Sequence, residues 1–134
     1  MKTNFVLNDD SVSVQTGDQY FDLHNCFDLS GLEIDFAKKQ VTLLLTSSDV
    51  TLMNKSPKTL RLLFSEVDFC YVSNGTTEKM VRDIAELGYK RPNDFDHNWL
   101  VNEKNKSPDD HLFIRLAGDE FIRVHGETAK LTYE

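Results

Sequence analysis

The chain has 134 residues, of which 40% are hydrophobic and 28% are charged, values typical of a globular protein and far from those of disordered chains. Because this length is too short for two ordinary domains, residues 1–134 are expected to form a single domain around one core. The formal net charge of −7 argues against a nucleic-acid-binding protein, which needs a basic face, and favours a partner that has a basic surface.

The hydropathy pattern and the cysteine content bear on location. The apolar run at the start, residues 5–7, is too short for a secretory signal. No apolar stretch approaches the roughly 20 residues of a membrane span, so no membrane partner is expected. Cys26 and Cys70 are too few for a secreted disulfide framework and lie in apolar, strand-like surroundings. We expect a cytoplasmic protein with two buried thiols, the alternative being a disulfide between adjacent strands.

Strands are predicted between residues 21 and 45, because apolar and polar residues alternate there at a period of two. The apolar set changes parity at Gly31, from Phe21, Leu23, Phe27 and Leu29 to Leu32, Ile34 and Phe36. A bulge or turn at this glycine would keep one face apolar. With residues 37–40 as a hairpin loop, the pairs would be Phe36 with Val41, Ile34 with Leu43 and Leu32 with Leu45.

A second parity change occurs at Ser65-Glu66, and it predicts one long, bulged strand over residues 60–71. Turn and capping residues at 74–77 then precede the one predicted helix, at about residues 77–87. The helix is inferred from apolar residues at helical spacing: Met80, Val81, Ile84 and Leu87. Gly88 is expected to end it.

The last third of the chain is predicted to be β-structure. Gly118-Asp119 fits a two-residue hairpin turn. That turn would place Leu112, Ile114, Leu116 and Phe121 on one face, Phe113, Ile122 and Val124 on the other, and His125 opposite Leu112. Residues 129–133 are predicted to form a final strand. The expected fold class is α+β: a curved, mainly antiparallel sheet of about six to seven strands with the helix at 77–87 packed against it.

The richest polar cluster lies in the long segment between residues 90 and 111. Carboxylates and imidazoles together could bind a divalent metal or perform acid–base chemistry. The candidates are Asp94, Asp96, His97 and His111. Such residues are also common in any solvated loop, so that interpretation stays open. No nucleophile motif, phosphate-binding loop or dinucleotide fingerprint is found, so no cofactor is expected and an enzyme is the less favoured class.

The same segment carries large apolar residues between its charges. Tryptophan is a frequent interface anchor, and long loops often bind partners. The partner-binding candidates are Phe95, Asp96, Trp99, Glu103, Asp109 and Asp110. In the alternative interpretation, Trp99 attaches the loop to the core within a helical turn at residues 98–103.

Four segments of the chain resemble small bacterial immunity-type and uncharacterised proteins: residues 21–27, 32–35, 41–45 and 60–67. These proteins open with a Leu-His strand, here Leu23-His24, followed by hairpins and by a Leu-x-Phe-x-x-Val strand, here Leu62 to Val67. The resemblance covers about residues 20–72. It implies a cytoplasmic protein that neutralises a toxin by binding it and has no catalytic activity.

Three hypotheses of function follow. The leading one is a noncatalytic acidic binding protein, of the immunity-type inhibitor class, that uses residues 94–111 and the acidic N-terminal third. The second is a small metal-binding protein or metal-assisted enzyme built on the segment from Asp94 to His111. The third is a structural subunit that self-associates through an edge strand at Ala129 to Tyr133.

Overall fold

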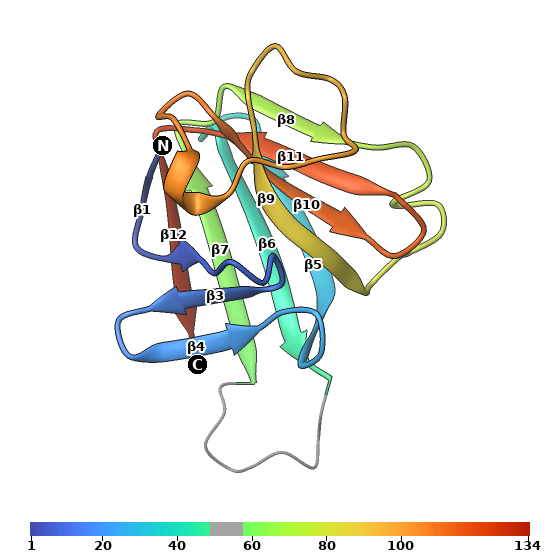
Figure 1. Ribbon diagram of the computed structural model, residues 1–134. Coiled ribbons are helices and arrows are strands. Elements are labelled where there is room, and N and C mark those ends of the chain that lie inside the picture. Colours follow the sequence, from blue (N-terminus) through green and yellow to red (C-terminus); the bar gives the residue numbers. More distant parts are fainter. Residues whose placement is uncertain (49–57) are drawn as a thin grey trace.

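The computed structural model describes residues 1–48 and 58–134, in which twelve strands form three sheets (Figure 1). The five-stranded sheet has the order β1 (Lys2–Thr3), β12 (Thr128–Tyr133), β7 (Thr59–Ser65), β6 (Gln40–Ser47) and β5 (Phe27–Asp35). The four-stranded sheet has the order β8 (Phe69–Val72), β11 (Phe121–His125), β10 (His111–Leu116) and β9 (Ile84–Lys90). The three-stranded sheet consists of β2 (Val6–Leu7), β3 (Ser13–Thr16) and β4 (Gln19–Asp22). All neighbouring strands are antiparallel except β1 and β12, which are parallel.

The predicted α+β class, the single sheet and the count of six to seven strands are wrong, although the antiparallel pairing is as expected. Within the described residues there is no α-helix and only one 3-10 turn, η1 (Glu103–Asn105). The predicted helix at 77–87 is a run of turns over residues 74–80 followed by β9. Met80, at φ +52°, adopts a left-handed backbone conformation that a right-handed helix cannot contain.

A β-bulge explains the misleading helical spacing of Ile84 and Leu87. In the pairing of β9 with β10, Leu87 lies opposite Ile114 and Ile84 lies opposite Leu116, with a register shift between the two pairs. The extra residue returns both side chains to the same face, where both are buried. A bulged strand therefore places residues three apart on one face, as a helix does.

One hydrophobic core joins the three sheets. The five-stranded sheet contributes Val41, Leu43, Leu45, Leu60, Leu62, Phe64, Ala129 and Leu131. The four-stranded sheet contributes Ile84, Leu87, Tyr89, Leu112, Ile114, Leu116, Ile122 and Val124. The three-stranded sheet adds Leu7, Val14 and Phe21. The Phe21 ring lies 6.1 Å from that of Phe27 and 5.2 Å from that of Tyr133, so β4 packs against both β5 and β12.

The bulge predicted at Gly31 is confirmed by a register shift between Leu29 and Gly31 in the pairing of β5 with β6. The hairpin beyond it is two residues out of the predicted register, since Ile34 pairs with Val41 and Leu32 with Leu43. A shift of two preserves the faces of a strand. Leu32 and Ile34 therefore still point inward, but Phe36 falls in the turn and is 88% exposed.

The prediction of one long strand through Ser65-Glu66 is wrong, because the chain changes sheets there. β7 ends at Ser65 in the five-stranded sheet, and β8 begins at Phe69 in the four-stranded sheet. The chain returns through Gly126, between β11 and β12. A Cβ atom on Gly126 would lie 2.5 Å from the Ser65 carbonyl oxygen, so the two crossings pack backbone against backbone.

The final strand, β12, is confirmed, with Ala129 and Leu131 buried. Its outer edge is covered rather than free: β1 pairs with its first residues, and the Asn4 side chain both donates to and accepts from the Leu131 backbone, at 2.9 and 2.7 Å. These contacts do not favour self-association through Ala129 to Tyr133.

The cysteines lie in different parts of the fold. Cys26 precedes β5 and is half-buried, and Cys70 lies in β8 and is exposed. The expectation of two buried thiols is therefore wrong for Cys70.

We expect Gly126→Ala to lower the free energy of unfolding by about 1–3 kcal/mol, because the added methyl group would force the two crossings apart. Chemical denaturation measures the change. The matched control is Ala37→Ser in the exposed turn between β5 and β6, which should change stability by less than about 0.5 kcal/mol. Equal effects of the two substitutions would contradict the close packing at Gly126.

Candidate binding site on the outer face of the four-stranded sheet

The hairpin of β10 and β11 determines which side chains lie on the outer face of the four-stranded sheet. Its turn spans residues 117–119, one residue longer than predicted, and Gly118 and Asp119 have φ of +90° and +72°. Ile114 consequently pairs with Ile122 and Phe113 with Arg123. A change of one residue in register exchanges the relative faces of two strands, so the predicted division of side chains between the faces is wrong.

The outer face carries aromatic and basic side chains instead of a solvated polar row. Phe113 is fully buried there but lies outside the main core. Its ring stacks on that of Phe121 at 4.9 Å, and Phe121 in turn stacks on Tyr71 of β8 at 5.4 Å. The His97 ring lies 4.3 Å from Phe121. A second, smaller cluster of packed side chains thus lies between the sheet and the segment 91–110, which we call the covering loop.

Arg123 is the central residue of this cluster and is only 1% exposed. Its guanidinium donates to the backbone carbonyl oxygens of Arg91, Pro92 and Asp94 at 2.8, 3.2 and 2.7 Å. Its Nε also donates to Nδ1 of His111 at 2.9 Å. These hydrogen bonds fix the first part of the covering loop on the sheet.

Aromatic rings enclose the same guanidinium. Its carbon lies 5.5 Å from the Phe69 ring centre and 5.2 Å from that of Phe95, within cation–π range. Six residues line a shallow cleft of about 260 Å³ at this point: Phe69, Tyr71, Phe95, His97, Phe121 and Arg123. This volume is below the range usual for small-molecule sites, and the cleft therefore fits a side chain of a partner better than a cofactor.

Two further cations hold the rest of the covering loop. The buried Lys90 ammonium donates to Asp94 Oδ2 at 3.0 Å and to the Trp99 carbonyl oxygen at 2.7 Å. Arg91 pairs with the buried Asp110 and donates to the Asn105 carbonyl oxygen at 3.1 Å. The carboxylates of Asp94 and Asp110 are thus neutralised by the protein's own cations.

The four metal-ligand candidates do not form a ligand set. Asp94 pairs with Lys90, Asp96 accepts from the Asn98 amide, and His97 and His111 both contact Arg123. Among the residues that the structure describes, no group of three or more His, Cys, Asp or Glu side chains is placed to hold a metal ion. The guanidinium between the two imidazoles would repel a divalent cation.

The six partner-binding candidates separate into two groups. Asp110 is buried, and Glu103 accepts from the Leu7 amide at 3.1 Å and pairs with Lys106, so both have structural partners. The other four are exposed: Phe95 (67% exposed), Asp96, Trp99 (58% exposed) and Asp109.

The loop attaches to the sheet by smaller residues than expected. Val101 is buried and pairs with Tyr89, and Leu100 rests directly on Gly88, where a Cβ atom would lie 2.4 Å from the Leu100 Cβ. The predicted helical turn at 98–103 is wrong, since the only turn of helix in the described loop is η1. These neighbours provide the attachment, and the Trp99 ring, whose centre lies 4.7 Å from the Lys90 ammonium, stays more than half exposed.

Sequence reasoning missed four residues of the site: Phe69, Tyr71, Phe121 and Arg123. The available signal was Arg123 itself, a charged residue within the otherwise apolar strand pattern of residues 121–124. With the correct turn length, it would have been placed opposite Phe113 and beneath the covering loop.

Both histidines of the cluster are held in the neutral form. Burial, followed by the positive charge of Arg123, lowers the pKa of His111 from 6.5 to about 4. The same two causes, in the same order, lower the pKa of His97. A neutral His111 can accept the hydrogen bond from Arg123 Nε through Nδ1, which a protonated ring could not do.

Comparisons with protein-family models, with curated proteins and with solved structures found no match. In the part of the chain described, no helix is long and apolar enough to cross a membrane.

We expect Arg123→Met to lower the free energy of unfolding by about 2–4 kcal/mol, because buried carbonyl oxygens lose their donors. Limited proteolysis should show new cleavage between residues 91 and 110. Arg82→Met is the matched control, because the Arg82 side chain is largely exposed and makes one ion pair at 3.5 Å with Asp28. A folded Arg123→Met protein with an uncut loop would contradict the role of Arg123.

Stability should fall as the pH is lowered from 6.5 toward 4. In this window the unfolded chain protonates its histidines, whereas His111 stays neutral in the fold because its pKa is about 4. One such group reduces the unfolding free energy by up to about 1.4 kcal/mol per pH unit. His111→Asn keeps an acceptor near the position of Nδ1 but does not titrate, so its unfolding free energy should depend less on pH. Identical profiles for both proteins would count against this assignment.

Proposed function

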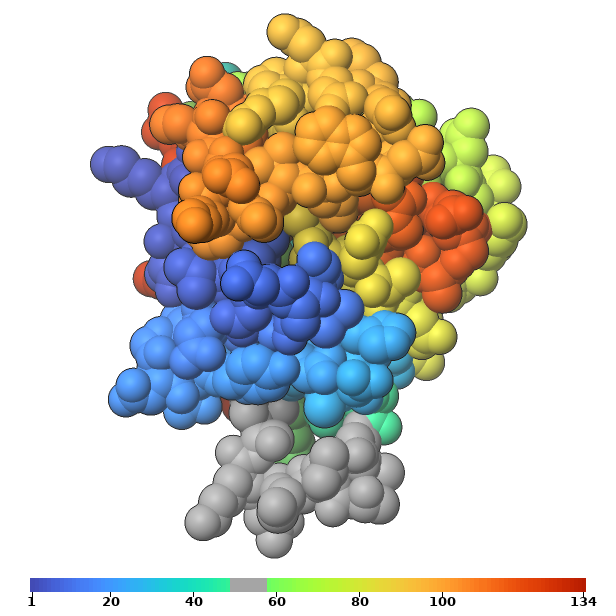
Figure 2. Space-filling model, viewed as in Figure 1, coloured from blue at the N-terminus to red at the C-terminus, as the bar shows by residue number. Residues whose placement is uncertain are grey.

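We propose that this chain is a noncatalytic acidic binding protein that covers a basic surface of a protein partner, as an immunity-type inhibitor would cover its toxin. The observation that carries the proposal is the display of Phe95 and Trp99 on a loop fixed by buried cations. Both side chains are more than half exposed, yet the backbone beside each is bound by Arg123 or Lys90. Figure 2 shows the covering loop, in yellow and orange, forming the upper part of this face.

Fixing the loop before binding favours affinity. A flexible loop would lose conformational entropy on association, and a loop already held by hydrogen bonds loses less. Large aromatic side chains contribute much of the binding energy at protein interfaces. Tyr71, which is also partly exposed, lines the cleft beside Phe95 and extends the aromatic surface onto β8.

Charge supports a basic partner. The net charge of −7 would accelerate encounter with a positively charged protein. Within the covering loop, Asp96 and Asp109 are exposed, whereas Asp94 and Asp110 are paired internally. The attraction would therefore come from the exposed carboxylates of the loop.

The resemblance to immunity-type proteins supports the class of function. It covers residues 20–72, whose described part includes most of β4 and all of β5 to β8, whereas the proposed contact surface lies mainly in the covering loop. The class and the surface thus rest on different parts of the chain. A cytoplasmic location belongs to the same proposal.

The test is affinity capture from the native cells, with the retained partner then purified and its dissociation constant measured. Phe95→Ala and Trp99→Ala should each weaken binding by about 30-fold, the effect expected of residues that dominate an interface. Tyr20→Ala is the matched control, because this aromatic residue is similarly exposed on β4 of the three-stranded sheet.

The rate of association should also fall as ionic strength rises. Capture of no protein, or equal affinity for all three variants, would overturn the proposal.

A further inference from the structure

Within residues 1–48 and 58–134, the outer edge of β5 has no neighbouring strand over most of its length. β5 is the last strand of the five-stranded sheet. On its outer side it is held at its start, where Asp28 bridges to Asp83 and the Leu29 amide donates to the Arg82 carbonyl oxygen at 2.8 Å. From Ser30 to Asp35 no described strand pairs with this edge. Unpaired backbone donors and acceptors there could accept another strand.

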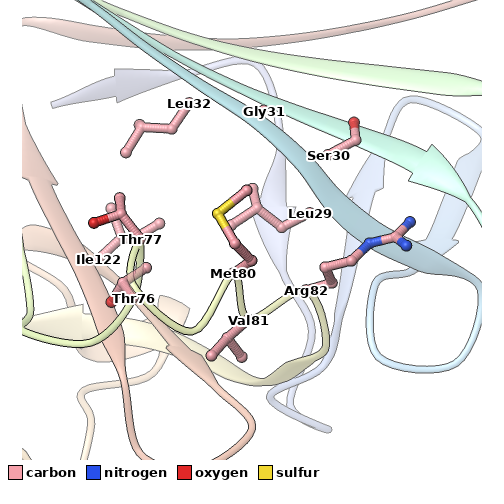
Figure 3. A pocket seen from close by; sticks show the side chains of 10 residues that line it. All are labelled: Leu29, Ser30, Gly31, Leu32, Thr76, Thr77, Met80, Val81, Arg82 and Ile122. Atoms are coloured by element: carbon pink, nitrogen blue, oxygen red, sulfur yellow. The ribbon is translucent and has the colours of Figure 1, made fainter.

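An apolar cavity of about 420 Å³ lies directly beside this edge (Figure 3). Leu29, Gly31 and Leu32 of β5 form one wall, the turn segment 76–82 forms another, and Ile122 of β11 also lines the cavity. Figure 3 shows the Met80 side chain at the centre of the lining residues, with the Arg82 guanidinium directed away from it. Met80 is 74% exposed, so the apolar lining is accessible from outside.

The gap between the sheets continues along the same strand. A second hollow, of about 230 Å³, is lined by Ile34 and, across the gap, by Phe69 of β8. Leu32 and Ile34 pair with the buried Leu43 and Val41, so they face the interior, yet Ile34 is 44% exposed. Apolar side chains on the inward side of β5 are thus partly exposed, and a strand added at this edge could place its own apolar side chains beside them.

The outward side of β5 has a different character. Glu33 and Asp35 alternate with Leu32 and Ile34, and both carboxylates are exposed. β5 contains three acidic residues and no basic one. A strand added at this edge would place one set of its side chains over the apolar gap and the other set beside Glu33 and Asp35.

We infer that the open edge of β5 is a second binding surface, which accepts a β-strand of a protein partner in which apolar and basic residues alternate. Strand addition of this kind takes affinity from backbone hydrogen bonds and selectivity from alternate side chains. A second copy of this chain fits poorly, because each copy carries a net charge of −7 and its β5 is acidic. The inference does not depend on the contact surface proposed for the covering loop.

The probe is the blocked heptapeptide acetyl-Lys-Val-Lys-Val-Lys-Val-Lys-amide, whose length matches residues 29–35. Titrated into the ¹⁵N-labelled full chain, it should shift the amide signals of residues 30–35 and of Met80. Its affinity should exceed by about tenfold that of Lys-Lys-Lys-Lys-Val-Val-Val, which has the same composition without the alternation. The acidic analogue with Glu in place of Lys should bind weakest.

Two variants test the surface directly. Ile34→Lys places a charge over the apolar gap and should weaken binding by about tenfold. Because that substitution could disturb β5, the nearly isosteric pair Glu33→Gln with Asp35→Asn provides a second test. It should weaken binding of the basic peptide and reduce the dependence of that binding on salt. Phe95→Ala with Trp99→Ala should leave peptide binding unchanged, which separates this surface from that of the covering loop.

Three results would overturn the inference: signal changes scattered over the acidic surface, equal affinity for the alternating and the block peptide, or no binding of the alternating peptide. It would also fail if the β5 signals of the free protein changed on dilution together with a dimer mass, because a second copy would then occupy the edge.

Discussion

The outer face of the four-stranded sheet depends on the burial of Arg123. Removing a guanidinium from water is costly, and no carboxylate among the described residues hydrogen-bonds to this one in compensation. Backbone carbonyl oxygens of the covering loop, two neutral imidazoles and two aromatic rings take the place of water. This arrangement exists only when residues 91–97 lie on the sheet, so the cation and the loop order one another. Two features follow: the depressed pKa values of His97 and His111, and the fixed position of Phe95.

The ion pairs of the covering loop show that some acidic residues of the chain add little to its negative surface. Segments rich in aspartate are usually solvated, but here Asp94 and Asp110 compensate Lys90 and Arg91 at the end of β9 and the start of the loop. Carboxylates that balance internal cations attract a basic partner only weakly, because their field is largely cancelled at a distance. The effective negative surface consists of the carboxylates without such partners, including Asp96 and Glu33. The net charge alone does not identify them.

Sequence periodicity located β5 to β7 and β10 to β12, but it missed β1 to β3 and predicted a helix in place of β9. Two of the errors can be traced to bulges and to the length of one loop. Strands with single-residue bulges produce spacings that are not of period two. At Gly31 the glycine and the parity change together revealed the bulge, because both flanking runs were long. Between Ile84 and Leu87 the runs were short, and the spacing of three matched a helix. The loop length of the β10–β11 hairpin had a larger effect. One additional residue in the loop decides whether Arg123 or Ile122 faces the core, and local turn preference did not reveal that additional residue. The segment 94–111 could be selected as a candidate from composition, but its covering position required the sheet register.

The two edges of the five-stranded sheet differ in how far their backbone groups are paired. At one edge, β1 pairs with β12, and Asn4 supplies hydrogen bonds to the Leu131 backbone where β1 has ended. At the other edge, pairing stops after Leu29, and the bulge at Gly31 and the carboxylates of Glu33 and Asp35 follow. Bulges and charges on edge strands prevent uncontrolled pairing between identical chains. The same carboxylates would attract a strand of opposite charge, so one set of residues can both disfavour self-association and select a basic partner. Protection against self-association alone would require only the bulge and the charges. The accessible apolar gap beside β5 is not needed for that protection, and it is the feature that favours binding of a partner strand.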